Sequence, residues 1–183
     1  MLELKLVEHC APTLAGLKTA NLFNYKCSDM DTLIEELRAE SRKLNKKGVF
    51  IEILKRNQTG VLLYVYRKKK LEEDFAKPGV AELMQKYGYK NRDIQDCIAH
   101  LQSSFQNRDC FPHEIGLFLG YPLEDVVGFI EQGGKNCKCS GIWKVYCNEC
   151  EARKQFAKFE KCKDVYVRQF INGRSITQLT IAA

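Results

Sequence analysis

The residues best suited to chemistry begin with an adjacent histidine and cysteine near the N-terminus. His9 and Cys10 lie where an alternating apolar and charged segment, residues 2–8, gives way to Pro12, a residue typical of a first helical turn. A thiol at the positive N-terminal end of a helix is acidified, and a neighbouring imidazole can act as its base. We therefore expect Cys10 to be a nucleophile, a redox thiol or a soft metal ligand, with His9 supplying proton transfer. The alternative is that Cys10 is a small buried side chain.

A second candidate segment contains His113 and Glu114 in the first turn of a predicted helix. Histidine titrates near neutral pH and can serve as an acid, a base or a ligand. Glu114 can orient a histidine or bind a ligand, although a carboxylate in a first turn also simply complements the helix dipole. Gly120-Tyr121-Pro122 predicts a tight corner at which Tyr121 can line a pocket.

A third candidate is a group of four thiols within 14 residues, which could coordinate zinc or an iron–sulfur cluster. The first pair is spaced CxC and the gap to the second pair is short, so the spacing does not match that of known zinc sites. Exposed or half-buried free thiols are the favoured interpretation, and a metal-binding protein without catalysis is the alternative. The four thiols are Cys137, Cys139, Cys147 and Cys150, and Cys162 lies one predicted helix further on.

A basic run, Arg67-Lys68-Lys69-Lys70, follows Tyr64 and Tyr66. Aromatic residues beside basic ones suit single-stranded nucleic acid. The acidic residues 72–74 follow at once and cancel most of this charge, so a solvated strand end is the favoured interpretation. We do not expect nucleic acid as a partner, and a regulatory or interaction module with weak nucleic-acid binding is a further alternative.

Hydrophobic periodicity predicts the elements that must position these residues. Alternation predicts an N-terminal strand at residues 2–8 and a C-terminal strand at 176–181, and β-branched runs predict a central hairpin at 49–56 and 61–67. Residues 164–171 fit helix or strand equally. The fold class is therefore α+β, a small, mostly antiparallel sheet packed with about six to eight helices. Helices are predicted at 12–23, 28–48, 78–88, 91–105, 112–120, 122–133 and 148–159, and a further short strand at 142–146.

Length and composition set the broad class. A chain of 183 residues with 45% hydrophobic and 28% charged residues fits a single globular domain, residues 1–183. Its longest strongly apolar run, residues 61–66, is far shorter than the roughly 20 residues of a membrane helix. No signal-peptide core is present, so we expect a cytoplasmic protein whose nine cysteines are free thiols. The net charge of +6 permits an anionic ligand, and the oligomeric state is left open.

Three segments together resemble a known family. They are His9-Cys10-Ala11-Pro12-Thr13-Leu14-Ala15-Gly16-Leu17-Lys18; Pro112-His113-Glu114-Ile115-Gly116-Leu117-Phe118-Leu119-Gly120-Tyr121-Pro122 with Asp125, Val126, Gly128, Phe129 and Ile130; and Gly141-x-Trp143-Lys144-Val145-Tyr146. Over nearly its whole length the chain is similar to the bacterial domain-of-unknown-function family 3793. The resemblance implies a bacterial cytoplasmic protein and no established activity, ligand or fold. It adds weight to His9, Cys10, His113, Glu114 and Cys162, and not to Cys147 or Cys150.

These observations lead to a thiol-centred site for a small, anionic molecule, either a binding site or an enzymatic one. Its candidate catalytic residues are Cys10, His9, His113 and Glu114, and its candidate ligand contacts are Thr13, Lys18, Tyr121 and Trp143. Lys18, two turns along the predicted first helix, is the expected contact for an anionic group. The hypothesis requires the Cys10 sulfur to face an accessible cavity at the positive end of that helix.

Overall fold

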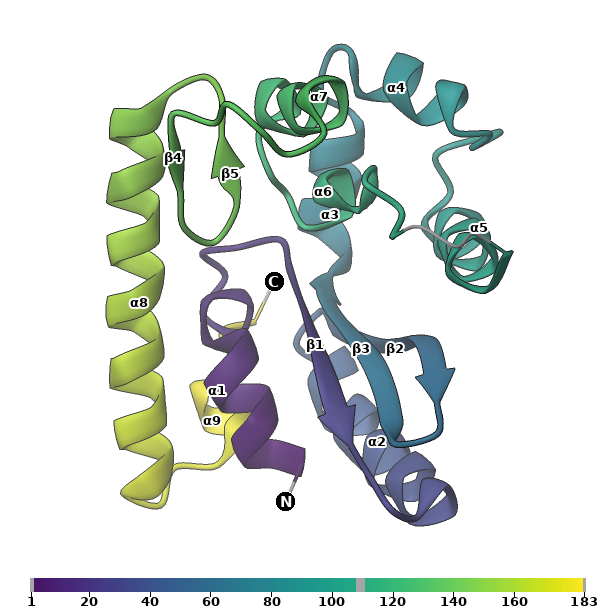
Figure 1. The fold of residues 1–183 in the computed structure, drawn as a ribbon. Coiled ribbons are helices and arrows are strands. Elements are labelled where there is room, and N and C mark those ends of the chain that lie inside the picture. The colour runs from purple at the N-terminus through teal and green to yellow at the C-terminus, as the bar shows by residue number, and fades with distance from the viewer. Residues whose placement is uncertain (1, 108–110, 183) are drawn as a thin grey trace.

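The fold is organised around a three-stranded antiparallel sheet with helices on both faces. The computed structural model describes residues 2–107 and 111–182. Its sheet contains β1 (Ala20–Lys26), β2 (Val49–Asn57) and β3 (Gly60–Arg67) in the order β1-β3-β2 (Figure 1). Every residue of the central strand β3 is buried, because alternate side chains of a strand enter opposite cores. The α+β fold class predicted from the sequence is confirmed.

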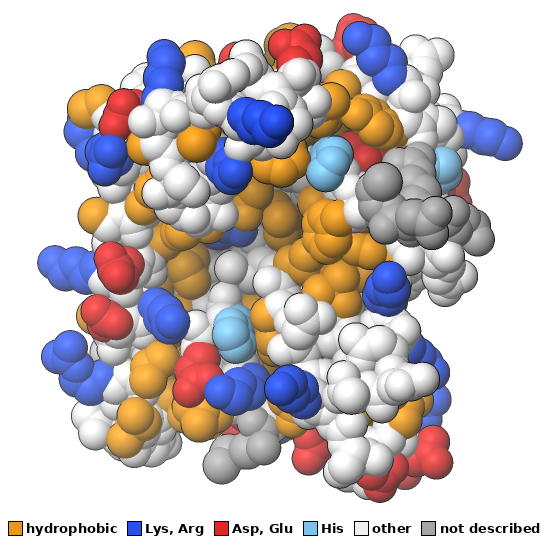
Figure 2. Space-filling view, in the orientation of Figure 1, with side chains coloured by type: hydrophobic (Ala, Val, Ile, Leu, Met, Phe, Trp, Pro, Cys, Tyr) orange, Lys and Arg blue, Asp and Glu red, His pale blue; other side chains and the backbone are white. Residues whose placement is uncertain are grey.

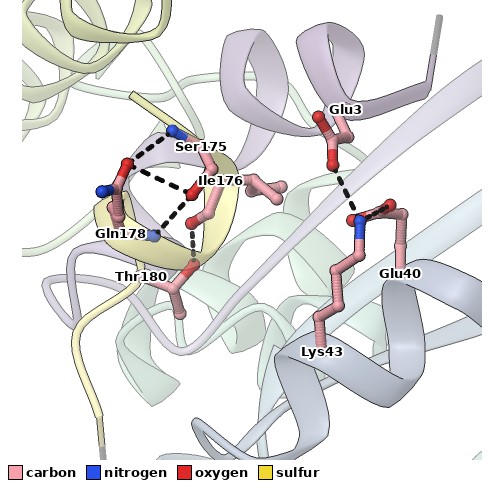
Figure 3. A network of polar contacts seen from close by, with 7 residues as sticks. All are labelled: Glu3, Glu40, Lys43, Ser175, Ile176, Gln178 and Thr180. Atoms are coloured by element: carbon pink, nitrogen blue, oxygen red, sulfur yellow. Dashed lines mark hydrogen bonds and ion pairs between the residues drawn. The ribbon is translucent and has the colours of Figure 1, made fainter. Parts of the chain in front are cut away.

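The first core lies between the sheet and the helices from the two ends of the chain. Val61, Leu63 and Val65 of β3 face this side. They pack with α1 (Leu2–Leu14), α2 (Met30–Asn45) and the short α9 (Ile176–Leu179), and the long helix α8 (Glu149–Ile171) lies along α1 (Figure 1). The Nζ of Lys43 donates to Glu3 at 3.1 Å and to Glu40 at 2.7 Å, which links α2 to α1 (Figure 3).

The second core lies on the opposite face of the sheet. Leu62, Tyr64 and Tyr66 of β3 point into it, and the Tyr64 hydroxyl donates to the carbonyl of Phe118 at 2.6 Å. The helices that cover this face are α3 (Lys68–Phe75), α4 (Val80–Lys86), α5 (Ile94–Asn107), α6 (Ile115–Phe118) and α7 (Leu123–Gln132). The described residues contain no helix that combines the length and the apolar composition needed to cross a bilayer.

A third, smaller core joins a short hairpin to α8. The hairpin consists of β4 (Cys139–Ser140) and β5 (Lys144–Val145), and only the second strand was predicted, over the longer range 142–146. Trp143 packs with Phe159 and Phe156 of α8. A Cβ atom at Gly141 would lie 2.4 Å from the Phe156 ring, so this contact requires glycine. The hairpin is thereby held against α8.

The predicted N-terminal strand at residues 2–8 is wrong, because these residues belong to helix α1. The buried residues Leu2, Leu6, Cys10 and Leu14 recur every four residues and form one helical face. The seven-residue segment 2–8 is too short to distinguish this helical period from the two-residue period of a strand. The predicted helix at 12–23 is also wrong beyond Leu14. Gly16 adopts a φ of +71°, which favours glycine, and the chain then turns into β1.

The predicted C-terminal strand at residues 176–181 is wrong as well. Residues 176–179 form α9, begun by a capping box in which the side chains of Ser175 and Gln178 each accept a hydrogen bond from the other's backbone N–H (Figure 3). This capping fixes one turn of helix where alternation alone favours a strand. The ambiguous residues 164–171 belong to α8.

Other predicted elements are confirmed. The central hairpin forms as β2 and β3, and the predicted helices in the middle of the chain form as α2, α4, α5, α6 and α7, with shorter ranges. Asp29 rather than Ser28 caps α2, and Asn148 caps α8 as predicted, accepting from the N–H of Glu151. Within the described residues the helices number nine, two of them of four residues.

Candidate functional site

A cavity of about 550 Å³ lies between the α1–β1 connection, the α6–α7 corner and the β4–β5 hairpin. Figure 2 shows this face hollowed near its centre, with hydrophobic side chains around the hollow. The volume falls within the range of small-molecule sites. The lining residues are Lys18, Asn21, Leu22, Phe111, His113, Ile115, Gly116, Leu119, Tyr121, Asp125, Val126, Phe129, Ser140, Gly141, Ile142, Trp143 and Lys144.

Lys18 is the buried basic residue of this cavity, with only 6% of its surface exposed. Its Nζ donates to the carbonyl of Ala20 and lies 5.1 Å from the centroid of the Tyr121 ring. No carboxylate of the described residues forms an ion pair with Lys18, and Asp74 pairs instead with Lys77 at 2.5 Å. Burial lowers the pKa of Lys18 to about 7, although Cys10 and Asp74 act in the opposite direction.

An aromatic wall stands beside Lys18. The Tyr121 ring stacks on the indole of Trp143, with centroids 4.9 Å apart and planes inclined by 28°. The ring of Phe156 in α8 meets the indole in a T-shaped arrangement, with centroids 4.5 Å apart. The Tyr121 hydroxyl donates to the carbonyl of Ile142 at 3.3 Å, and burial raises the pKa of Tyr121 to about 12. The wall therefore offers aromatic surface while its tyrosine stays protonated.

Asp125, in the first turn of α7, fastens this wall to the rest of the cavity. Its Oδ2 accepts from the indole N–H of Trp143 at 2.8 Å. Its Oδ1 accepts from the backbone N–H groups of Tyr146 at 2.7 Å and Cys147 at 2.9 Å. Because these three donors occupy both carboxylate oxygens, Asp125 positions the hairpin rather than presenting a free charge to a ligand.

The exposed residues that line the cavity include two apolar side chains and one histidine. Phe111 is 51% exposed and Ile142 is 41% exposed, and both line the cavity. His113 is exposed, lines the same cavity and meets the ring of Phe129 edge-on at 5.1 Å. Glu114 is fully buried and does not line the cavity, so the predicted pairing of His113 and Glu114 at a ligand does not form.

The predicted role of Cys10 as an acidified thiol at a helix N-terminus is wrong. Cys10 lies in the later half of α1, so the negative end of the helix dipole is nearer to it than the positive end. Its side chain has no exposed surface and packs in the first core, and burial raises the pKa of its thiol despite the nearby Lys18. The thiol is therefore neutral and shielded from solvent.

The other residues of the N-terminal segment contribute little directly to the cavity. His9 is exposed on the outer side of α1 and stacks on Phe23 at 4.6 Å, and burial of part of its ring lowers its pKa. Thr13 is buried and its hydroxyl donates to the Oδ1 of Asn21 at 2.7 Å. Because Asn21 lines the cavity, Thr13 acts on the site only by holding Asn21.

The five cysteines predicted as metal ligands are free thiols of differing exposure. Cys147 and Cys150 are exposed, while Cys137, Cys139 and Cys162 are half-buried. Within residues 2–107 and 111–182, no three side chains of His, Cys, Asp or Glu are grouped so that they could hold a metal ion. The geometry of these residues gives no support to the expectation of zinc or an iron–sulfur cluster.

The basic run at residues 67–70 divides into a buried arginine and three lysines in the first turn of α3, of which Lys68 and Lys69 are exposed. Arg67 is buried at the end of β3, and its guanidinium donates to the carbonyls of Thr13, Leu14 and Ile181 at 2.6 to 2.7 Å. It closes the C-terminal end of α1, whose carbonyls lack helical partners. A wider groove of about 1440 Å³ follows β2 between α2 and α5 and carries Arg38 and Arg42, but its lining contains no buried cation like Lys18.

Sequence reasoning named Lys18, His113, Tyr121 and Trp143, which meet at one cavity, and missed Asp125, Lys144 and Asn21. Asp125 follows Pro122 in a first helical turn, where a carboxylate is ordinarily explained by the helix dipole. Lys144 is half-buried and its Nζ donates to the carbonyl of Gly134 at 2.5 Å. No local pattern in the sequence indicates that these residues converge, because they come from three separate elements.

Comparison with known proteins gives a family and no activity. The family described as "Protein of unknown function (DUF3793)" matches residues 6–180 of the chain. No curated protein and no solved structure matches the chain. The three segments on which the resemblance to this family rests, from residues 9–18, 112–130 and 141–146, all contribute to the cavity.

Proposed function

Because the chain belongs to the DUF3793 family of proteins of unknown function, we propose its function from the cavity itself: the protein binds a small, flat, negatively charged molecule there. The observation that carries the proposal is the burial of Lys18 beside the Tyr121–Trp143 stack without a carboxylate partner. A buried cation is costly unless it is paired, and an anionic ligand would supply the missing partner.

The charge of the cavity supports an anion rather than a cation. Lys18, Lys144 and His113 supply basic groups, whereas Asp125 is the one acidic residue among the described residues that line the cavity. The hydrogen bonds to Asp125 already compensate that carboxylate. Lys18 and Lys144 donate to backbone carbonyls but form no ion pair with a described carboxylate, so an anion in the cavity would be their first charged partner.

The shape of the cavity supports a flat ligand. The stacked rings of Tyr121 and Trp143 form one side, and Phe129 and the exposed Phe111 contribute further aromatic surface. Aromatic groups gain both burial and stacking energy against such surfaces. The hydrogen bonds of Asp125 hold the wall in place before a ligand arrives, which reduces the entropy lost on binding.

The test uses a matched pair of aromatic probes, 1-naphthoate and its neutral amide 1-naphthamide, in isothermal titration calorimetry near pH 7. The native protein is expected to bind naphthoate at least about tenfold more tightly than naphthamide, since a charge-assisted hydrogen bond contributes more than a neutral one. Lys18→Met is expected to remove this preference, and Lys135→Met, which alters an exposed lysine outside the cavity, is expected to keep it. Equal affinities for the two probes in the native protein would refute the proposal.

A further inference from the structure

We infer that Lys18 is also a nucleophilic amine, which forms an imine with the carbonyl group of a small aromatic aldehyde or ketone that carries an acidic group. This inference rests on the proposed function, because it assigns the substrate class to the same cavity. The amine would meet the carbonyl at the buried end of the cavity, while the acidic group would face Lys144 and His113.

The position of the amine is fixed by its surroundings. The backbone N–H groups of Leu17 and Lys18 both donate to the carbonyl of Pro12, at 2.8 and 3.1 Å, which holds the connection against the end of α1. The Lys18 Nζ then donates to the carbonyl of Ala20 beside the ring of Tyr121. A hydrogen bond to a carbonyl uses an N–H and leaves the lone pair of a neutral amine free to attack.

Burial favours the neutral form of the Lys18 amine near physiological pH. Burial lowers the pKa of Lys18 to about 7, so about half of the amine is unprotonated at pH 7. An ordinary lysine, with a pKa of about 10.4, is unprotonated there to less than about one part in 10³. Desolvation of a lysine in an apolar pocket is a recognised way of activating it as a nucleophile.

The chemical step needs no additional reagent. The nitrogen lone pair bonds to the carbonyl carbon, and a proton moves from nitrogen to the former carbonyl oxygen to give a carbinolamine. The carbon–oxygen bond then breaks, water leaves with the second nitrogen proton, and a carbon–nitrogen double bond remains. Nothing is oxidised or reduced. His113 is the imidazole that lines the cavity, and it can move the proton to the departing hydroxyl.

The test traps the imine. Native protein is incubated near pH 7 with 4-carboxybenzaldehyde, sodium borohydride reduces any imine to a stable secondary amine, and mass spectrometry of a digest locates the adducts. Lys18 is expected to be labelled at least about 100-fold more than Lys144, which lines the same cavity and serves as an internal control. Repeating the reaction across pH gives a second measurement on unaltered protein, in which labelling should reach half of its maximum near pH 7 rather than near pH 10.

The outcomes separate this inference from the proposed function. Selective labelling of Lys18, prevented by excess 1-naphthoate and absent from Lys18→Met, supports both. An aldehyde that displaces naphthoate in calorimetry but leaves Lys18 no more labelled than Lys144 overturns the imine and preserves the binding function. If neither the aldehyde nor naphthoate binds, both are overturned.

Discussion

The indole N–H of Trp143 donates to the carboxylate of Asp125 at 2.8 Å, and this bond joins the β4–β5 hairpin to α7. The same carboxylate accepts from the backbone of Tyr146 and Cys147 just after β5. One buried side chain thus fixes the position of the wall that faces Lys18. The architecture of the cavity depends on this bond more than on the length of the hairpin strands, which have two residues each.

Asp125→Ala will therefore destabilise the protein strongly. Three donors lose their acceptor, one in a buried hydrogen bond and two in partly buried ones, and the free energy of unfolding should fall by about 3 to 5 kcal/mol. Asp125→Asn keeps one acceptor oxygen but turns an N–H₂ group toward another donor, so a smaller loss of about 1 to 2 kcal/mol is expected. Urea unfolding followed by circular dichroism measures both. Asp164→Ala, at an exposed site of α8, is the control, and a loss no larger than the control's would contradict the assigned role.

Lys18 will make stability rise with pH just above neutrality. Its pKa is lowered by burial to about 7 in the folded chain, whereas the unfolded chain holds the proton up to about 10.4. Between these values the unfolded state binds more protons, so raising the pH favours folding. From about pH 7 to about pH 8.5 the gain should be about 1.5 kcal/mol, and Lys18→Met should lack it. Urea unfolding of both proteins at the two pH values tests this.

Comparing the two proteins isolates Lys18 from its neighbours. Burial raises the pKa of Cys10, and this contribution opposes the trend because the unfolded thiol loses its proton at lower pH than the folded one. Asp74 also acts on Lys18, and His113 and Lys144 line the same cavity. All of these groups remain in Lys18→Met. Identical pH dependence in the two proteins would mean that Lys18 keeps an ordinary pKa.

Cys10 will resist alkylation in the native protein. It has no exposed surface, and burial raises the pKa of its thiol, so the reactive thiolate is suppressed. Cys147 and Cys150 are exposed and should react first with iodoacetamide near neutral pH. Mass spectrometry after timed quenching gives the order of labelling. Reaction of Cys10 as fast as that of Cys147 would restore the thiol-centred hypothesis.

The fate of Cys10 shows what the sequence could and could not predict. Alternation in residues 2–8 is too short to separate strand from helix, and reading it as a strand moved the start of the first helix to Pro12. This start places Cys10 at the positive N-terminal end of a helix. In the structure Cys10 is nearer to the negative C-terminal end of α1. Longer periodic segments, such as the hairpin and α5, were predicted correctly because packing and local preference agree there.

The candidate site was predictable only in pieces. Tyr121 and Lys18 could be selected by residue type, but their meeting depends on the turn at Gly16 and on the α6–α7 corner, which are separated by about a hundred residues. The burial that lowers the pKa of Lys18 is likewise a property of the assembled fold. Asp125 could not be distinguished from an ordinary first-turn carboxylate, since its partners are supplied by the hairpin.

Arg67→Met will destabilise the protein. The guanidinium donates to the carbonyls of Thr13, Leu14 and Ile181, and the first two of these bonds are buried. The substitution removes all three bonds and the packing of a buried side chain at the end of α1. A decrease of about 3 kcal/mol in the free energy of unfolding is expected. Lys68→Met, at the exposed neighbouring position, should change stability by no more than about 0.5 kcal/mol. Similar small effects of both substitutions in urea unfolding would contradict the capping role.

The central claim is that Lys18 is a desolvated amine in a cavity that receives anions, and the pKa of Lys18 measures it directly. Nuclear magnetic resonance of protein carrying ¹³C-labelled lysine, assigned by comparison with Lys18→Met, would follow the Lys18 Cε signal across pH with and without saturating 1-naphthoate. The account predicts a pKa of about 7 in the free protein, in keeping with its burial, and an increase of at least about one unit when the anion is bound. A pKa near 10 that naphthoate does not change would contradict it.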